Sequence, residues 1–295
     1  MPTGLFRVRL PDGSTRLARG AAADGPREVL PAELTLDVLL GPAGPRLADA
    51  LAAPSEARVP SDARVLAPVE SQEVWAAGVT YLRSREARVE ESLDASPYDR
   101  VYLAERPELF FKSAGWRVRG PGAEVAVRAD SPWNTPEPEL ALVLDASMAV
   151  AGYTVGNDVS SRSIEGENPL YLPQAKVYDG ACALGPCIVP ATEVEPPFTI
   201  TLRILREGLV AFEGTTSTER MKRGFEELAA YLGLALDFPH GAVLLTGTGV
   251  VPDSPFTLQE GDVVRIEVEG LGALENPVAT VGADRPAHAS TEAGP

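Results

Sequence analysis

Residues 133–162 read WNTPEPELALVLDASMAVAGYTVGNDVSSR and contain the pattern that decides the fold. An apolar run follows Glu139, a short polar turn lies at residues 145–147, and a second largely apolar run ends at Asp158. Short apolar runs bounded by turn residues are typical of buried strands. Because the turn is short, the two strands are expected to pair antiparallel, with the end of the second beside the start of the first.

Two glutamates, Glu137 and Glu139, stand at the start of the first strand, each directly after a proline. Side chains at i and i+2 of a strand point to the same face. Proline donates no backbone hydrogen bond, so Pro136 and Pro138 indicate an edge strand or the first residues of a strand. The returning strand would bring Asp158 next to Glu139. Three carboxylates without His or Cys suit a hard cation, so we predict a Mg²⁺ or Mn²⁺ site; a solvated strand end is the alternative for the glutamates alone.

The rest of the chain carries mostly strand signals and few helices, which predicts an α+β, mainly β fold, a roll or sandwich rather than a doubly wound sheet. A hairpin is expected over residues 5–18, around the turn sequence Pro-Asp-Gly. We predict a small N-terminal domain over residues 1–69, a catalytic domain over 70–282 and a disordered tail over 283–295.

One helix has clear boundary signals. Ser217 or Thr218 is expected to cap its start and Gly233 to end it. Its apolar stripe consists of Met221, Phe225, Leu228 and Leu232. Short helical pieces are also expected within residues 33–53, and a polar helical stretch over 81–95.

Composition excludes several classes of protein. Acidic residues outnumber basic ones 42 to 26, and a net charge of −16 argues against binding to nucleic acid or anionic membranes. No apolar run is long enough to cross a bilayer, and the N-terminus lacks a signal-peptide pattern, so a cytoplasmic enzyme or soluble binding protein is expected. Two cysteines five positions apart form neither a zinc motif nor a disulfide framework. Two histidines rule out a His-rich metal site and argue against a Ser–His–Asp triad.

Lysine is rare in this chain, with Lys112, Lys176 and Lys222 as the three lysines among 26 basic residues. Arginine stays protonated at any working pH, whereas the surroundings of a lysine can tune its protonation. A lysine retained in an arginine-rich sequence is therefore a candidate for chemistry that arginine cannot perform. Retention at the surface is the alternative for each, and a structural ion pair is a further alternative for Lys112.

The motifs GVTY, ELFFK, EPELALVLD, AGYTVGNDVSSR, QAKVYD, LGPCIV, LLTGTG and GDVVRIEVEGLGALENPV follow one another in this order. In this order they resemble the fumarylacetoacetate hydrolase superfamily, over roughly residues 70–281. The resemblance implies a mixed β-sandwich roll with a small N-terminal domain, assembled as a homodimer or homotetramer. It also implies that Glu137, Glu139 and Asp158 bind Mg²⁺ or Mn²⁺, that Lys176 is the active-site lysine, and that Thr248 binds substrate.

The sequence departs from the carbon–carbon hydrolases of this superfamily in the segment VTYLRSREARVEES, residues 79–92. Those hydrolases use a histidine there to activate water, and this segment has none. A base near neutral pKa is needed for that step, and an ordinary carboxylate is a poor substitute. The motifs T-Y-x-x-S-R, RPELFFK and SSRSIEGENPLYLPQAK are instead similar to the 2-keto-3-deoxy-D-arabinonate or xylonate dehydratase branch.

The resemblance therefore implies Mg²⁺-dependent dehydration of a 2-keto-3-deoxy pentonate to 2,5-dioxopentanoate through an enolate. Lys176 is expected to carry a proton or stabilise the enolate, with Glu108 as its acid/base partner. Arg83 and Ser84 are expected to hold the substrate's carboxylate or hydroxyls, and the partner is a small 2-keto acid. Glu167 belongs to a polar loop, with Glu165 and Asn168, that is expected to close over the substrate.

Rival interpretations remain open at this point. Acylpyruvate-type hydrolysis or diene-dioate isomerisation or decarboxylation would use the same metal site. A Schiff base on Lys176 would make the metal unnecessary. A non-catalytic sugar-acid or metal-binding module is the alternative outside enzymes. An ordinary surface charge is the alternative for Glu108 and for Arg83, and a purely turn-stabilising role is the alternative for Thr248.

Overall fold

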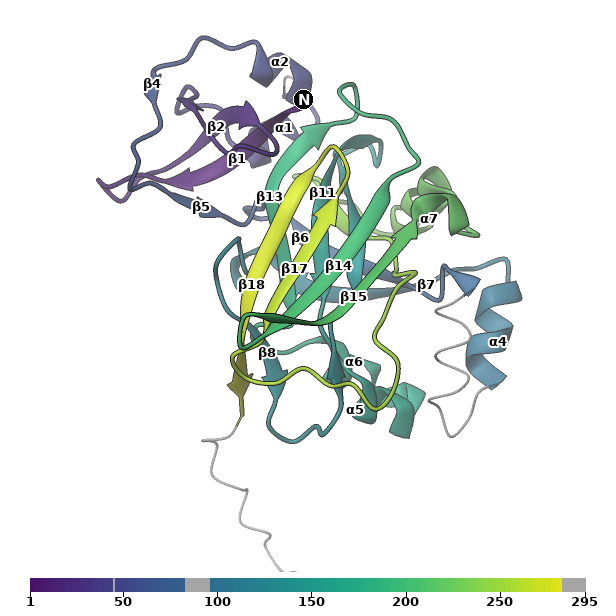
Figure 1. The fold of residues 1–295 in the computed structure, drawn as a ribbon. Helices are drawn as coiled ribbons and strands as arrows, with labels where there is room; N and C mark the ends of the chain where they lie inside the picture. The colour runs from purple at the N-terminus through teal and green to yellow at the C-terminus, as the bar shows by residue number, and fades with distance from the viewer. Residues whose placement is uncertain (45, 83–95, 283–295) are drawn as a thin grey trace, which may run out of the picture.

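The structure is a computed structural model that describes residues 1–44, 46–82 and 96–282 (Figure 1). Its described residues form an eleven-stranded sheet, a five-stranded sheet and a two-stranded ribbon, with few and short helices. The mainly β, mixed-sheet fold expected from the sequence is confirmed.

The large sheet is mixed. Its strands, in spatial order, are β4 (Ala57–Arg58), β3 (Glu28–Val29), β2 (Thr15–Ala21), β1 (Thr3–Arg9), β13 (Cys182–Pro190), β11 (Val150–Asp158), β10 (Pro138–Leu144), β16 (Ala242–Leu245), β6 (Glu73–Gly78) and β7 (Glu108–Ala114). Strand β5 (Arg64–Leu66) pairs with β1 off this path. Strands β16 and β6 are parallel, and the other neighbours are antiparallel.

The second sheet covers one face of the first and closes the core between them (Figure 1). Its strands are β15 (Leu209–Ser217), β14 (Thr199–Arg206), β17 (Val263–Val268), β18 (Gly272–Val281) and β8 (Val125–Arg128). Leu140, Leu142 and Val155 of the large sheet share one buried cluster with Ile200 and Ile266 of the small one. Burial of these apolar faces is the main stabilising term for a sheet-on-sheet fold. The two-stranded ribbon is formed by β9 (Asn134–Thr135) and β12 (Ser160–Ser161).

The predicted N-terminal hairpin is present as β1 and β2, joined through Gly13 at a φ of 86°. Strand β1 continues into the main sheet, because Leu5 pairs with Ile188 of β13. Leu5 and Ile188 also share a buried cluster with Val143 of β10. The N-terminal strands are thus attached to the larger part through both backbone pairing and apolar burial, and the domain boundary near residue 70 stays a prediction.

Strands β10 and β11 pair antiparallel as predicted, with Pro138 opposite Asn157 and Glu139 opposite Gly156. Strand β10 lies between β11 and β16, so the edge position that the prolines also allowed is wrong. Pro138 is instead the first residue of an interior strand, where its missing N–H interrupts little of the ladder.

The helices are α1 (Leu36–Leu39), α2 (Leu47–Leu51), α4 (Ser96–Leu103), α5 (Arg162–Glu167), α6 (Leu172–Lys176) and α7 (Phe225–Leu232). In the described part of the chain, none of them combines the length and the apolar character needed to cross a membrane. Helix α7 begins after Gly224 rather than at Ser217 or Thr218, which corrects the predicted start. Ser217 caps only a 3₁₀ turn at Thr218–Arg220, by accepting from the N–H of Glu219 at 3.2 Å.

A tertiary contact explains the later start of α7. Met221 forms an isolated bridge with Tyr81, and the N–H of Lys222 donates to the carbonyl of Thr80 at 3.0 Å. These contacts hold the backbone out of a helix before Gly224. Gly233 follows the last helical residue as predicted. Most of the helical stretch expected over 81–95, and the tail expected over 283–295, fall outside the described residues.

Candidate metal centre and catalytic pocket

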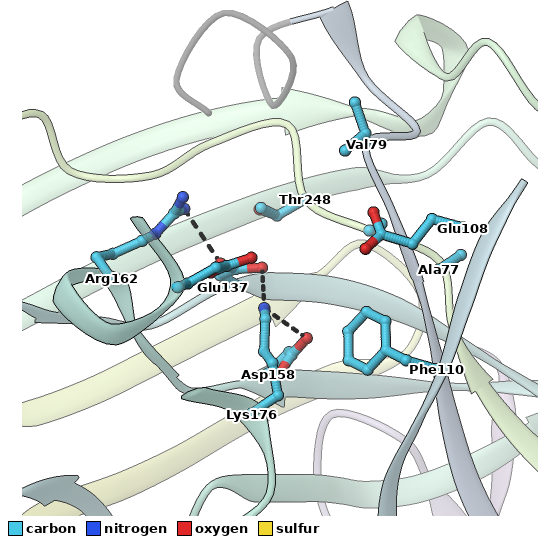
Figure 2. Close-up of a pocket in the computed structure, with 12 residues that line it drawn as sticks. Ala77, Val79, Glu108, Phe110, Glu137, Asp158, Arg162, Lys176 and Thr248 are labelled. Atoms are coloured by element: carbon cyan, nitrogen blue, oxygen red, sulfur yellow. Dashed lines mark hydrogen bonds and ion pairs between the residues drawn. The ribbon is translucent and has the colours of Figure 1, made fainter. Parts of the chain in front are cut away.

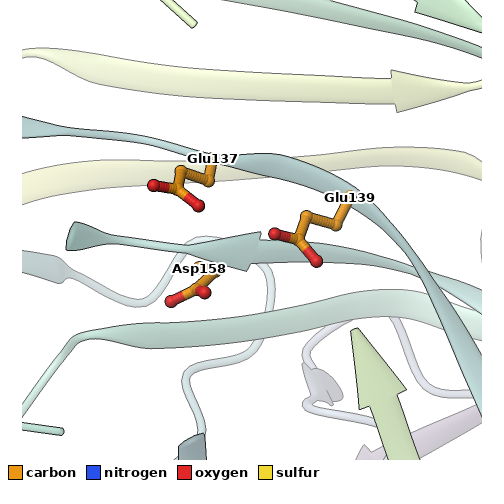
Figure 3. A group of neighbouring side chains, drawn as sticks. All are labelled: Glu137, Glu139 and Asp158. Carbon is orange, nitrogen blue, oxygen red and sulfur yellow. The ribbon is translucent and has the colours of Figure 1, made fainter. Parts of the chain in front are cut away.

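Three buried carboxylates meet at one end of the β10–β11 pair (Figure 3). Glu139 lies at the start of β10, Glu137 directly precedes that strand, and Asp158 is at the end of β11. One oxygen from each lies within 4.8 Å of the others, and the three residues are 4%, 1% and 1% exposed. Acidic side chains are rarely so buried without a counter-charge, so cations are expected in contact with this cluster.

Local pairing brings these carboxylates together. Besides the ladder, the N–H of Asp158 donates to the carbonyl of Glu137 at 3.0 Å. The i, i+2 spacing then places Glu139 on the same face of the strand as Glu137. The convergence that the sequence predicted is therefore what the structure shows, and ligation by these residues stays a prediction.

Lys176, the last residue of α6, lies against this cluster (Figure 2). Its Nζ donates to Oε2 of Glu137 and Oδ2 of Asp158, at 3.0 Å each, and to Oγ of Ser160 at 2.6 Å. The ring of Phe110 lies 5.5 Å from the same nitrogen. With its side chain 2% exposed, Lys176 is held by neighbours on several sides and faces the carboxylates.

Two further cations face the same carboxylates. Arg162, the first residue of α5, places Nη2 3.1 Å from Oε1 of Glu137, and its Nε donates to Oγ1 of Thr135 at 3.0 Å. Lys112 of β7 forms an ion pair with Oδ1 of Asp158. Glu137 and Asp158 therefore each meet two cationic side chains.

Glu139 has a different environment. Its Oε2 accepts from the backbone N–H of Gly247 at 2.6 Å. Burial raises the pKa of Glu139 well above its usual range, and the charges of Asp158 and Glu137 raise it further. A carboxylate in this position needs a proton or a cation nearby. A divalent ion with oxygen ligands fits the all-oxygen donor set of this cluster.

Gly247 is required by the turn that follows β16. Its φ is 89°, a region that residues with a Cβ rarely adopt. A Cβ there would lie 2.1 Å from Oγ1 of Thr80, which itself donates to the carbonyl of Thr246 at 2.6 Å. The turn therefore needs glycine for its conformation and also because the side chain of Thr80 lies so close to residue 247, whose N–H donates to Glu139.

A narrow pocket opens above the carboxylates (Figure 2). Besides Glu137, Asp158 and Lys176, its lining includes Val79, Glu108, Phe110, Arg162, Glu165 and Thr248. The carboxylate of Glu108 lies over Gly78, where a Cβ would be 2.0 Å from Oε2. Because Gly78, the strand partner of Glu108, has no side chain, it leaves the space that this carboxylate occupies.

The remaining predicted residues divide into three groups. Thr248 lines the pocket and also donates to the carbonyl of Val250 at 3.0 Å, so it serves the turn as well. The polar loop expected at Glu165 and Glu167 is wrong, because both residues belong to helix α5; Glu165 is buried in the pocket lining, whereas Glu167 is exposed at the end of α5 and outside that lining. Arg83 and Ser84, with Arg85, lie outside the described residues.

Sequence reasoning gave no site role to Ser160, Arg162 or Gly247, and read Lys112 as an ion-pair partner alone. Ser160 and Arg162 stand two and four positions after Asp158 in the motif NDVSSR, and Gly247 stands in TGTG. For Ser160 and Arg162, the short distance in sequence from the predicted ligand Asp158 was therefore a signal that could have found them. Gly247 lies 108 positions from Glu139, so the strand pairing of β10 with β16 was needed to find it.

Comparison with known proteins agrees with this geometry. Residues 73–279 match the family described as fumarylacetoacetate (FAA) hydrolase C-terminal. A probable 2-keto-3-deoxyxylonate dehydratase of Haloferax volcanii is 52% identical over 222 residues, which cover 75% of this chain and 76% of that protein. A 2-dehydro-3-deoxy-D-arabinonate dehydratase of Saccharolobus solfataricus is 46% identical over 224 residues, covering 74% and 75%.

A solved structure gives the same result at the level of the fold. A 2-keto-3-deoxy-D-arabinonate dehydratase complexed with magnesium and 2,5-dioxopentanoate superposes with a TM-score of 0.80. The two chains are 38% identical, and the match covers 94% of this chain and 98% of the other. With its family match, its relatives and its acidic cluster, this chain belongs to the fumarylacetoacetate hydrolase family.

Proposed function

We propose that this protein is a magnesium-dependent hydro-lyase that converts a 2-keto-3-deoxy pentonate to 2,5-dioxopentanoate. The observation that carries the proposal is the buried cluster of Glu137, Glu139 and Asp158 beside Lys176, in a chain 52% identical to a probable 2-keto-3-deoxyxylonate dehydratase. The magnesium and 2,5-dioxopentanoate in the similar solved structure support both the cofactor and the product.

Glu137, Glu139 and Asp158 would hold the ion. When bound, Mg²⁺ supplies Lewis acidity toward the carboxylate and keto oxygens of a 2-keto acid, which makes the C3 proton easier to remove. The cationic side chains of Lys176 and Arg162 in the lining of the narrow pocket would orient the substrate's carboxylate end toward the metal site.

The chain's own residues then move the protons. Lys176 Nζ, at the base of the pocket, would take the C3 proton as the neutral amine and become the ammonium, and Ser160 and Phe110 fix the position of that nitrogen. Glu108 lines the pocket from β7 and, in its protonated form, would give a proton to the C4 hydroxyl as it leaves. One proton from C3 and the hydroxyl from C4 leave as water, and the product reaches the 5-aldehyde by tautomerisation of an enol.

The number and the positions of the histidines fit a dehydratase better than a hydrolase that uses a histidine to activate water. The chain has two. His240 is exposed in the turn before β16, whereas the pocket lies beyond the other end of that strand, at Gly247 and Thr248. His288 lies outside the described residues. Among the described lining residues, proton transfer falls to Lys176 and the carboxylates.

The direct test incubates the Mg²⁺-loaded protein separately with 2-keto-3-deoxy pentonates and with acylpyruvates, and follows both by mass spectrometry. Formation of 2,5-dioxopentanoate supports the proposal. Cleavage of acylpyruvates without any dehydration would contradict the proposed dehydratase function and indicate a carbon–carbon hydrolase instead. Assembly as a homodimer or homotetramer and a cytoplasmic location are further proposals, supported by the family resemblance and by the composition of the chain.

A further inference from the structure

Lys112 is a buried lysine to which the mechanism above gives no part. Its Nζ forms an ion pair with Oδ1 of Asp158 and donates to the carbonyls of Val159 at 3.0 Å and Lys176 at 2.6 Å. Its side chain is 0% exposed. An ammonium group has three N–H donors on one nitrogen, so it can donate to two carbonyls and still face a carboxylate as its counter-charge.

The backbone is shaped to direct this side chain. Between β6 and β7, Val74 pairs with Ser113 and the next residue, Trp75, pairs with Phe111. Lys112 is thus the extra residue of a β-bulge. Bulges turn a side chain away from the regular alternation of a strand, and they occur often beside active sites. Strand β7 therefore supplies Glu108 and Phe110 to the pocket and turns Lys112 toward Asp158.

The three partners of Lys112 belong to separate parts of the site. Asp158 and Val159 mark the end of β11, whereas the carbonyl of Lys176 is at the last residue of α6. A carbonyl at a helix end lacks an intrahelical partner and needs a donor from elsewhere. Asp158 also receives Lys176 Nζ on its other oxygen, Oδ2. Lys112 therefore holds the carboxylate of Asp158 and the backbone of Lys176 in a defined position relative to each other.

We propose that Lys112 is a positioning residue that joins Asp158 to the backbone of Lys176, so that the metal ligand and the proton-transferring lysine keep one geometry. This inference rests on the proposed function, because it takes Asp158 as a metal ligand and Lys176 as the proton carrier. Arginine is a poor replacement, since its guanidinium spreads its donors over a plane and cannot direct three of them from one nitrogen.

The test compares the Lys112→Met variant with the unaltered protein. Methionine keeps a long unbranched side chain but removes every N–H donor of the lysine. Calorimetric titration of the metal-stripped proteins with MgCl₂ gives the metal dissociation constant, and steady-state kinetics give kcat and KM. We expect the dissociation constant to rise and kcat to fall, each by roughly 10–100-fold, the range found when groups that orient metal ligands are removed. KM is expected to change less than kcat.

Two control variants separate positioning from general stability. Lys222→Met removes an exposed lysine that donates to the carbonyl of Tyr102, away from the carboxylates. Leu232→Ala opens a cavity under α7 and lowers the melting temperature without touching the pocket. Both are expected to keep the metal affinity and kcat of the unaltered protein at a temperature where they are folded.

A Lys112→Met protein with unchanged metal affinity and unchanged kcat would overturn the inference while leaving the proposed function intact. If this variant shows no cooperative unfolding, Lys112→Arg takes its place: it should lower kcat and metal affinity in the same direction, and unchanged values would again overturn the inference. If the unaltered protein neither binds Mg²⁺ nor forms 2,5-dioxopentanoate, the proposed function fails first and the inference fails with it.

Discussion

The backbone N–H of Asp158 donates to the carbonyl of Glu137 at 3.0 Å. This backbone hydrogen bond holds the two carboxylate residues beside each other without a bound ion. Both carboxylates share the ammonium of Lys176 as a counter-charge, 3.0 Å from an oxygen of each. The site thus combines a preformed anionic cluster with a lysine that contacts it directly. Such an arrangement suits chemistry in which a proton leaves carbon next to a metal-bound carbonyl group.

Glu139→Gln should abolish metal binding and activity together. Glu139 offers one of the three carboxylates of the cluster and is fully buried, so the neutral amide removes a ligand charge that no nearby group can replace. We expect kcat to fall by about 100-fold or more, since metal Lewis acidity contributes several kcal/mol. Titration with MgCl₂ and a turnover assay check this. Glu260→Gln, an exposed carboxylate, is the control, and full activity of Glu139→Gln in metal-free buffer would contradict the mechanism.

Lys176→Met should separate metal binding from catalysis. Removal of the ammonium takes away one of the two cations that Glu137 and Asp158 each contact and keeps both carboxylates for Mg²⁺, whereas the proton carrier is lost. General acid–base groups contribute about 10²–10⁴-fold, and we expect a loss of kcat within that range with metal binding retained. Lys176→Arg should not restore activity, because arginine does not release its proton. Borohydride trapping of a substrate adduct on Lys176 would instead establish the Schiff-base mechanism.

Gly78→Ala should displace the carboxylate of Glu108 with little effect on folding. The new Cβ would lie 2.0 Å from Oε2 of Glu108, at the end of a side chain that can move away. A displacement of about 1 Å can cost about 100-fold in rate, so kcat should fall to near that of Glu108→Gln. Kinetics on both variants, with melting curves, check this. Unchanged kcat in both would remove Glu108 from the mechanism.

Gly247→Ala should damage both stability and the metal centre. A φ of 89° costs an L-residue about 1–2 kcal/mol, and here the Cβ also meets Thr80. Gly261 has a φ of 88° with nothing within 4 Å of its Cβ position, so Gly261→Ala isolates the backbone cost. We expect both variants to melt earlier, but only Gly247→Ala to bind Mg²⁺ more weakly, because its N–H orients Glu139. Equal metal affinities in the two would contradict this.

Removal of metal should lower thermal stability. Burial and repulsion raise the pKa of Glu139 in the uncompensated cluster, and a bound cation relieves both. At a metal concentration of about 100 times the dissociation constant, binding stabilises by about 2.7 kcal/mol, or roughly 5–10 °C in melting temperature for a chain of this size. Calorimetry with EDTA and with MgCl₂ measures the difference. The Glu139→Gln variant should show none, and an equal shift in that variant would place the ion elsewhere.

The sequence by itself determined the metal carboxylates, because the reasons for their convergence are local. A period of two places Glu137 and Glu139 on one face, and a short turn returns the chain so that Asp158 meets them. The rarity of lysine marked Lys112, Lys176 and Lys222 as candidates, and the family resemblance singled out Lys176 among them. The same local signals were wrong for the start of α7, where contacts with Thr80 and Tyr81 override the capping residues.

Only the tertiary structure decided which groups surround those carboxylates. The N–H of Gly247 and the ammonium of Lys112 reach Glu139 and Asp158 across separations of 108 and 46 positions, through strand neighbours that periodicity does not specify. Long-range pairing of β16 with β10, and a bulge in β7, place these donors. Sequence patterns report which face of a strand is buried, whereas the identity of the neighbouring strand depends on how the whole sheet assembles.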